Sequence, residues 1–349
     1  MGSAPRAGLP SVEPRSDVAR SGAARSAAEA RRWRPAVPRL DPWKLIGRAR
    51  EEELEPDGRL RPSTTLFLAG AECPFTCNFC DLWRQTIEGP TPPGALPAQI
   101  RDGLAGLPAA GRGEEILKLY NASNFFDARS VPEADDGEIA TLADGYGRVV
   151  VECHPHLLGA READGWRLRD RVHRFADALG GRLEVAMGFE TVHPEALASS
   201  RKGVGTADLA RAARHLLRAG IDVRAFVLVG APFVPLHEEL PWLERTVRFA
   251  LESGARLVSL IPVRGGEGEM ARLEAAGELE PPGLTRVEAA WEHCRAIEPR
   301  AVRLDTWDLE NLPTDSGGPQ DPASGRLERL RRAQTHPDWA SRELVSHER

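Results

Sequence analysis

TTLFLAGAECPFTCNFCD, residues 64–81, is the stretch that decides the fold. Its first six residues are β-branched or apolar, as in a parallel strand that is covered on both faces. Three cysteines follow at once, Cys73, Cys77 and Cys80, in a C-x3-C-x2-C spacing. Residues that directly follow a strand of a parallel sheet lie at its carboxyl edge, where α/β enzymes place their sites. We therefore expect a buried strand with a cysteine-rich site on the loop after it.

Runs of the same kind recur along the chain and alternate with longer amphipathic stretches. Together with 64–70, the expected strands are 116–121, 148–153, 182–188, 223–230 and 257–263. Between them, apolar residues repeat at helical spacing, and the repeats end at glycines such as Gly180 and Gly220. Such alternation gives parallel βαβ units with right-handed crossovers. We count six units between residues 64 and 298, which predicts an α/β fold: a partial, open (β/α)6 barrel, with a doubly wound sheet as the alternative.

Charge is distributed unevenly along the 349 residues, whose formal net charge is −6. Residues 1–50 hold eleven Lys and Arg against four acids, and residues 51–349 hold 35 against 48. A body that acidic is not a general nucleic-acid surface, so a polyanion would have to contact the N-terminal part or a local basic pocket. Composition and pattern divide the chain into a disordered Ala-, Arg- and Pro-rich tail, a lead-in segment, the barrel and a small C-terminal appendage, at 1–40, 41–63, 64–298 and 299–349.

The overall composition is that of a soluble protein. Apolar residues make up 41% and charged residues 28% of the chain, which excludes a wholly disordered protein. No stretch approaches the run of about 18 apolar residues that a membrane helix needs, and the N-terminus has no apolar secretory region. Five cysteines, three of them clustered, do not form a secreted disulfide framework. We expect a cytoplasmic protein with no membrane partner.

The three clustered cysteines predict a metal site. Three thiolates on one short loop can hold three irons of a [4Fe–4S] cube and leave the fourth iron free for a small chelating molecule. The alternative is zinc, which takes four tetrahedral ligands and would need Cys153 or His154 to arrive in space. A zinc-stabilised scaffold, or an iron–sulfur electron carrier, is therefore the non-enzyme interpretation. A disulfide fits worse, because three cysteines leave one over.

The spacing, the aromatic Phe79 directly before the last cysteine and the position after the first barrel strand resemble the signature of the radical S-adenosylmethionine (radical SAM) superfamily. The resemblance implies a [4Fe–4S] cluster held by Cys73, Cys77 and Cys80, S-adenosylmethionine (SAM) on the open iron, and Phe79 in the cofactor site. It also implies the reaction. An electron from a reductant such as flavodoxin or ferredoxin cleaves SAM to methionine and a 5′-deoxyadenosyl radical, which abstracts hydrogen from the substrate.

Over residues 64–312 the sequence is similar to the radical SAM group that contains the elongator catalytic subunit and the tRNA methylthiotransferases. Within that group it resembles proteins like the archaeosine synthase radical SAM subunit. The segments that carry this likeness are CPFTCNFCDLW, KLYNASNFFD, VVVECHPHL, EVAMGFETV, FVLVGAPFVP, SLIPVRGG and RLDTWDLE. The likeness implies C–N bond cleavage in a lysine-bearing deazaguanine of tRNA. The alternative is radical SAM chemistry on a small metabolite or lipid, which the acidic body favours.

The resemblance also assigns residues at the end of the second strand to the cofactor. In the family this place contacts the methionine amino group, and here it holds Asn121, Ser123 and Asn124 instead of the glycine-rich GGE of many members. Asn and Ser supply the same acceptors. Turn formation, which Asn favours, explains the two asparagines equally well.

Further charged residues follow the fourth strand. Glu190 lies at its end and is placed for the ribose or the ammonium group of the cofactor, with helix capping as the alternative. Arg201 and Lys202 come on the next loop, where they would neutralise a carboxylate or phosphate, or lie in solvent.

Candidate catalytic residues are Glu152, His154 and Lys118, and the first two are expected to face the lumen. Glu152 and His154 are two apart at the end of the third strand, so they point to the same face, where they would handle protons or form a satisfied buried pair. Lys118 lies inside an apolar strand, where an unpaired charge is costly. We therefore expect it to meet an acid, with Glu152 and Glu190 as candidates.

Overall fold

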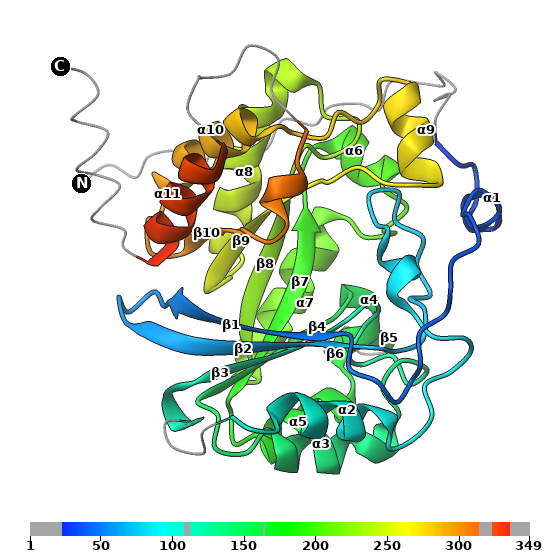
Figure 1. Cartoon of the computed structure of the whole chain (residues 1–349), viewed down its shortest axis with the longest axis vertical. Coiled ribbons are helices and arrows are strands. Elements are labelled where there is room, and N and C mark those ends of the chain that lie inside the picture. Colours follow the sequence, from blue (N-terminus) through cyan, green and yellow to red (C-terminus); the bar gives the residue numbers. More distant parts are fainter. Residues whose placement is uncertain (1–22, 108–111, 163–164, 314–322, 336–349) are drawn as a thin grey trace.

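The centre of the molecule is a curled, mostly parallel sheet (Figure 1), seen in a computed structural model that describes residues 23–107, 112–162, 165–313 and 323–335. Eight strands lie in the order β1-β2-β3-β4-β7-β8-β9-β10, and β5 and β6 form a separate hairpin. The strands are β1 (Gly47–Leu54), β2 (Leu60–Leu68), β3 (Ile116–Asn121), β4 (Arg148–Glu152), β5 (Gly159–Glu162), β6 (Gly165–Leu168), β7 (Leu183–Glu190), β8 (Asp222–Val229), β9 (Leu257–Pro262) and β10 (Val302–Leu304). Strand β1 runs antiparallel to β2, and from β2 onward each strand is parallel to its neighbours in the sheet.

Helices cover the outer face of the sheet (Figure 1). The helices are α1 (Ala27–Arg32), α2 (Ala95–Leu104), α3 (Asp136–Leu142), α4 (Pro155–Leu158), α5 (Asp170–Ala178), α6 (Pro194–Ser199), α7 (Thr206–Arg218), α8 (Glu239–Glu252), α9 (Glu269–Ala275), α10 (Leu284–Arg295) and α11 (Ala323–Thr335). Helix α2 packs on β2, α7 and α8 pack on β8, and α10 packs on β10. Among the helices of the described ranges, none is both long enough and apolar enough to cross a membrane.

The prediction of a partial α/β barrel is confirmed. All six expected strands are present, as β2, β3, β4, β7, β8 and β9, and they are parallel to one another. Two edge strands were not expected: β1, in the segment expected as a lead-in, and β10, in the C-terminal segment. The sequence of β1, GRAREEEL, hides its conformation because it is mostly charged and only its last two residues are buried.

The main hydrophobic core lies between the sheet and the outer helices. Helix α7 shows why the sequence packs this way. Its buried residues, Leu209, Ala212, Ala213 and Leu216, recur at helical spacing and form one face of the helix. Gly220 then takes a left-handed conformation (φ 72°), which ends the helix and turns the chain into β8.

The sheet curls around its inward face, the face opposite the outer helices (Figure 1). Buried ion pairs occupy this face along the N-terminal half of the strands. Arg224 of β8 donates to Glu184 of β7 (2.6 Å) and to Glu53 of β1 (3.0 Å), and Lys118 Nζ of β3 lies 2.6 Å from the Glu53 carboxylate. Burial alone would raise the pKa values of both carboxyls. The cations outweigh burial, so the pKa of Glu53 lies well below its usual value and that of Glu184 is lowered to about 2. The network ties β1 to β3, β7 and β8 across the inside of the curled sheet.

The two edge strands approach each other across the open side of the sheet. Arg303 of β10 donates to the Leu54 carbonyl of β1 at 2.7 Å. Helix α11 packs against β1, and its Gln334 side chain accepts the backbone N–H of Leu304 in β10 at 2.9 Å. The C-terminal helix therefore bridges the first and last strands of the sheet.

The boundary of the predicted N-terminal tail needs a correction. Residues 1–22 lie outside the described residues, whereas 23–40 contain α1 and make hydrogen bonds and ion pairs with the barrel. The arginines that made this segment look like a solvated tail find carboxylate and carbonyl partners on the folded body. The amino-acid composition shows that these arginines are present, but the residues with which they pair can be identified only from the folded structure.

Candidate functional site

The three cysteines lie on the loop 71–81, which leaves the carboxyl end of β2, and their thiols are free and partly buried. The chain after α6 holds this cysteine loop in place. The Asn78 side chain donates to the Ser199 carbonyl (2.9 Å), and Arg201 donates to the Thr76 carbonyl (2.8 Å). The sulfur positions are therefore set by a segment 121 residues further along the chain.

Burial raises the pKa of all three thiols, that of Cys77 to about 11, and the neighbouring thiols raise those of Cys77 and Cys80 further. Nearby Lys202 acts in the opposite direction on Cys73 and Cys77. Such thiols ionise when a bound metal supplies positive charge. In the part of the chain that the structure describes, no three His, Cys, Asp or Glu side chains are arranged as around a single metal ion. In a [4Fe–4S] cube each cysteine sulfur binds a different iron, so the cysteine ligands do not converge on one metal position.

Asn124 connects the first cysteine to the ends of the next two strands. Its Nδ2 donates to Cys73 Sγ at 3.2 Å, and its Oδ1 accepts the backbone N–H of His154 at 2.6 Å. With both ends of the amide engaged and the residue buried, its orientation is fixed. Hydrogen bonds to ligating sulfurs are one means by which proteins tune the potential of a cluster. Asn124 thus lies beside the cysteine loop, with its amide donor on the Cys73 sulfur.

Asn121 and Ser123 lie in the turn after β3 and differ in how their polar atoms are satisfied. Asn121 Oδ1 accepts the Ser123 N–H (3.0 Å), and its Nδ2 donates to Ser130 Oγ (3.3 Å). This is the turn formation that the sequence left open for Asn121. Ser123 Oγ, by contrast, is buried and has no hydrogen-bond partner among the described residues. Since an unpartnered buried hydroxyl is costly, Ser123 is the residue of this turn that fits contact with a ligand.

Glu190 and Lys202 form a buried ion pair at the carboxyl end of β7, with Lys202 Nζ 2.5 Å from Glu190 Oε1. Glu190 has φ 57° at a bulge in the pairing with β8, and its side chain lies over Gly188. A Cβ at position 188 would overlap both the carboxylate and the ammonium, so the pair requires glycine there. Burial lowers the pKa of Lys202, but Glu190 and Cys77 outweigh it and raise that pKa overall. The ammonium, 6.0 Å from the Phe79 ring centroid, therefore carries its charge beside the cysteine loop.

In the carboxyl-terminal half of the strands, some residues of the inward face are partly exposed to solvent. There, six strands each have one partly exposed residue among buried ones: Phe67, Tyr120, Glu152, Gly188, Phe226 and Ile261. Tyr120 and Phe226 meet edge to face, 6.3 Å between centroids. Burial, and then the charges of Glu190 and Asp305, raise the pKa of Glu152 to about 8. A partly exposed carboxyl group with such a pKa can give or take a proton near neutral pH.

Lys118 meets acids, as expected, but the predicted partners are wrong. Its Nζ lies 3.0 Å from Glu51 and 2.6 Å from Glu53, both on β1, and its ion pairs are not with Glu152 or Glu190. The physical reason is the edge strand β1, which brings its glutamates to the inward face beside β3. Lys118 is therefore part of the ion-pair network at the N-terminal half of the strands.

His154 has both ring nitrogens in hydrogen bonds. Its Nε2 bonds to the Lys202 carbonyl (3.0 Å), its Nδ1 accepts the His156 N–H (3.2 Å), and its ring stacks on Phe75 with 3.7 Å between centroids. Burial, together with the charges of Lys202 and His156, lowers the pKa of His154 to about 3. His154 is thus a neutral imidazole whose ring nitrogens bond to Lys202 and His156, and these partners differ from the buried pair with Glu152 that the sequence left open.

The shared face expected for Glu152 and His154 is not observed. Strand β4 ends at Glu152, and His154 is the N-cap of α4, so the two side chains have different neighbours. Cys153, between them, is 3% exposed in the core and donates to the His154 carbonyl. Both residues that were candidates for a fourth zinc ligand are thus engaged elsewhere.

The contacts of residues 23–40 with the cysteine loop were not predicted from the sequence. Arg34 Nη1 lies 2.6 Å from the Glu72 carboxylate, and Arg31 Nη2 donates to the Pro74 carbonyl at 3.1 Å. The only signal in the sequence is a run of arginines among apolar residues. The same run is typical of a solvated tail, so it does not predict the contact.

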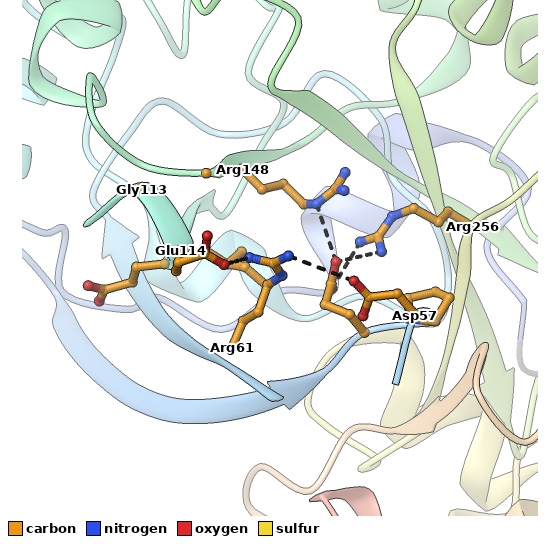
Figure 2. Close-up of a pocket in the computed structure, with 11 residues that line it drawn as sticks. Asp57, Arg61, Gly113, Glu114, Arg148 and Arg256 are labelled. Carbon is orange, nitrogen blue, oxygen red and sulfur yellow. Dashed lines mark hydrogen bonds and ion pairs between the residues drawn. The ribbon is translucent and has the colours of Figure 1, made fainter. Parts of the chain in front are cut away.

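A cavity of about 450 Å³ lies at the opposite, amino-terminal end of the strands. Its arginines pair with carboxylates: Arg61 lies 3.7 Å from Asp57, and Arg148 and Arg256 lie 3.7 and 2.8 Å from Glu55. Figure 2 shows Arg61 reaching toward Asp57, and Arg148 and Arg256 reaching toward a shared carboxylate. Parallel sheets bind their ligands at the carboxyl ends of the strands. We therefore assign the site to the cysteine end of the barrel.

Comparison with known proteins gives structural matches only. No protein-family model matches the chain, and no curated protein matches it. Among similar solved structures is the archaeal Methanocaldococcus infernus Elp3 with an N-terminal deletion, 16% identical with a TM-score of 0.46, covering 67% of this chain and 57% of that one. The chain thus spans little more than half the length of that Elp3 structure.

Two further structures resemble the chain to a comparable degree. The radical SAM methyltransferase TsrM from Kitasatospora setae, with tryptophan substrate and a SAM analogue bound, is 15% identical with a TM-score of 0.43, covering 81% of this chain and 62% of that one. Methylornithine synthase PylB is 12% identical with a TM-score of 0.42, covering 76% and 80%. These similarities concern the arrangement of strands and helices, and the functional conclusion below rests on the residues of the site.

Proposed function

We propose that the protein is a radical SAM enzyme in which Cys73, Cys77 and Cys80 hold a [4Fe–4S] cluster whose open iron binds SAM. Reductive cleavage of SAM would start a reaction on a substrate at the inward face of the barrel. The observation that carries the proposal is the three-cysteine loop at the carboxyl end of β2, fastened to the ends of the next strands by Asn124 and by the segment after α6.

The residues around the cysteines fit such a cofactor pair. Thiolate clusters carry negative charge, and the Lys202 ammonium lies where it offsets that charge. Asn124 offers a hydrogen-bond donor to one sulfur. The buried Ser123 hydroxyl, which has no partner in the described ranges, supplies a polar contact for a ligand beside the loop.

When bound, the cluster and SAM supply electron transfer and a carbon radical that abstracts hydrogen. The chain would do the rest. Ser123 and Glu190 would contact the polar groups of SAM, and the aromatic side chains of the inward face would exclude water from the reacting carbon. Glu152 would hold a proton at its carboxyl group for the substrate. For His154 and Lys118, whose polar atoms are engaged by neighbours, we propose supporting roles.

The substrate is a separate part of the proposal. The segments similar to archaeosine synthase-like proteins support modification of a tRNA nucleoside. The excess of acids over bases in residues 51–349 supports a small metabolite or lipid instead. Mass spectrometry of tRNA nucleosides and of small molecules from a deletion strain distinguishes the two: a lost or altered nucleoside supports tRNA, and an accumulated metabolite supports the alternative. In either case we propose a cytoplasmic enzyme that takes its electron from a flavodoxin or ferredoxin.

Anaerobic reconstitution tests the proposal. Wild-type protein should bind iron and sulfide and, with dithionite and SAM, release 5′-deoxyadenosine. Each of Cys73→Ala, Cys77→Ala and Cys80→Ala should abolish both properties. Cys294→Ala is the matched control, because that thiol is buried in α10 away from the loop, and it should retain both.

Two results would overturn the proposal in favour of the non-enzyme interpretations. One stoichiometric zinc without iron, after anaerobic purification, identifies a scaffold. A cluster that cycles between redox states but never cleaves SAM identifies an electron carrier.

A further inference from the structure

The segment before β1 covers the cysteine loop on the side away from the strand ends (Figure 1). Arg201, which anchors the loop at Thr76, also donates to the Ala24 carbonyl (3.2 Å) and pairs with Glu269 of α9. Glu269 in turn accepts the N–H of Ala24 at 2.8 Å. The loop, the N-terminal segment and α9 are therefore joined by one buried cluster of hydrogen bonds.

The cover packs directly against Cys77 and Cys80. Ala30 of α1 is 3% exposed and, together with Cys77 and Cys80, lines a gap of only about 10 Å³, about the room of a single water molecule. Beside it, the Arg34 guanidinium lies over the Trp83 ring, 5.0 Å from its centroid. On this side the short helix α1, together with the start of α9, lies against the cysteine loop.

The solvent side of this cover is basic, although most of the chain is acidic. Residues 23–40 hold five arginines and one acid, Glu29. Arg31 is half-exposed beside Glu72, at 3.6 Å. Arg25 and Arg32 are exposed, and no carboxylate within the described ranges pairs with their guanidinium groups. The side chains of Arg25, Arg31 and Arg32 are called the α1 basic face below.

We propose that the α1 basic face is the docking surface for the acidic face of a one-electron donor protein. The inference rests on the proposed function, which requires an electron from outside. One electron would leave the reduced cofactor of the donor and enter the cluster, so that the donor is oxidised and the cluster reduced, with no bond made or broken. Electron transfer slows steeply with distance, so the donor must approach where the least protein intervenes. Here that surface also has the complementary charge.

An RNA partner fits this surface less well. A substrate must bring its reacting carbon to the inward side of the cysteine loop, among the ends of β3, β4 and β7. The α1 basic face lies on the other side of that loop. The positive charge of the α1 basic face would attract either partner. Its location, on the side of the cysteine loop away from the strand ends, favours the electron donor.

The double variant R25E/R32E tests the docking surface on the reconstituted full chain. The probe is a purified acidic flavodoxin. Calorimetric titration of the reconstituted protein with oxidised flavodoxin measures the affinity. In a separate stopped-flow experiment, flavodoxin hydroquinone is mixed with the reconstituted protein and the rate of cluster reduction is followed. We expect the affinity to fall about tenfold at low ionic strength, the reduction rate to fall with it, and both differences to shrink in high salt. The matched control is R214E/R218E on α7, which makes the same charge change on exposed arginines elsewhere and should bind like the wild type.

The other outcomes separate the possible failures. Methyl viologen radical, a small cation that needs no docking surface, should reduce wild type and variant equally fast, and slower reduction of the variant would mean that the cluster itself had changed. Equal flavodoxin affinity in R25E/R32E and wild type, or an equal loss in the control, overturns the inference. Weaker binding of bulk tRNA with unchanged flavodoxin affinity would assign the surface to RNA. If dithionite and SAM give no 5′-deoxyadenosine with the wild type, the proposed function fails whatever the binding result.

Discussion

Replacing Lys202 with Met should destabilise the protein severely, because it leaves the Glu190 carboxylate buried without its partner. The two side chains are 6% and 8% exposed and meet at 2.5 Å. Removing one member of such a buried pair costs roughly 3–5 kcal/mol, whereas replacing both by neutral groups of similar size is often nearly neutral. We therefore expect Lys202→Met alone to lose roughly 3–5 kcal/mol of unfolding free energy, and K202M/E190Q to recover most of that loss.

Urea unfolding measures both variants, followed by fluorescence and circular dichroism so that coincident transitions justify a two-state analysis. The apo and reconstituted proteins are compared, because a bound cluster adds stability of its own. The control is Lys44→Met, the same substitution at a lysine whose side chain is 81% exposed, which should change stability by less than about 0.5 kcal/mol. A loss below about 1 kcal/mol for Lys202→Met, or a double variant as unstable as the single one, would refute the reasoning.

Three further changes follow from the same site. Asn124→Ala removes the donor to Cys73 Sγ and should make the reduction potential of the cluster more negative, which an EPR-monitored redox titration measures; an unchanged potential would contradict the proposed contact. Because the pKa of Glu152 is raised from its usual value to about 8, folding disfavours its ionised form, and this penalty grows as pH rises through that range. Glu152→Gln should therefore match wild-type stability near pH 4 and exceed it by roughly 2–4 kcal/mol near pH 9, and equal stability at both pH values would contradict the burial argument. Glu269→Gln weakens the hold on Arg201 and Ala24 and should speed tryptic cleavage at the arginines of the N-terminal segment, whereas unchanged cleavage would show that this acid does not hold the cover.

The barrel strands could be predicted because their chemistry is local. A parallel strand covered on both faces is apolar almost throughout, and β3 and β9 therefore begin within a residue of their predicted positions. Strand β1 could not be predicted in this way, because its inward glutamates are satisfied by Lys118 and Arg224, which are remote in sequence. A buried charge looks like an exposed one until its partner is known.

The site follows the same division. The cysteine spacing and the position after the first strand are sequence properties, and they placed the loop. The roles of Asn121 and Asn124 in the turn after β3 could not be predicted from the sequence. Their side chains have the same chemistry, and only the folded turn determines which neighbours each one contacts. Asn121 closes the turn, and Asn124 reaches Cys73. The contact of α1 with the cysteine loop joins segments more than 40 residues apart through arginines, which carry no directional signal in the sequence.

The central claim is an iron cube on three thiolates with one iron open to SAM, and electron paramagnetic resonance tests it most directly. Reconstituted protein reduced with dithionite should show the signal of a reduced [4Fe–4S] cluster, and adding SAM should change its g values, because the open iron gains new ligands. A cluster signal that SAM leaves unchanged, or protein that takes up zinc and no iron, would contradict the account.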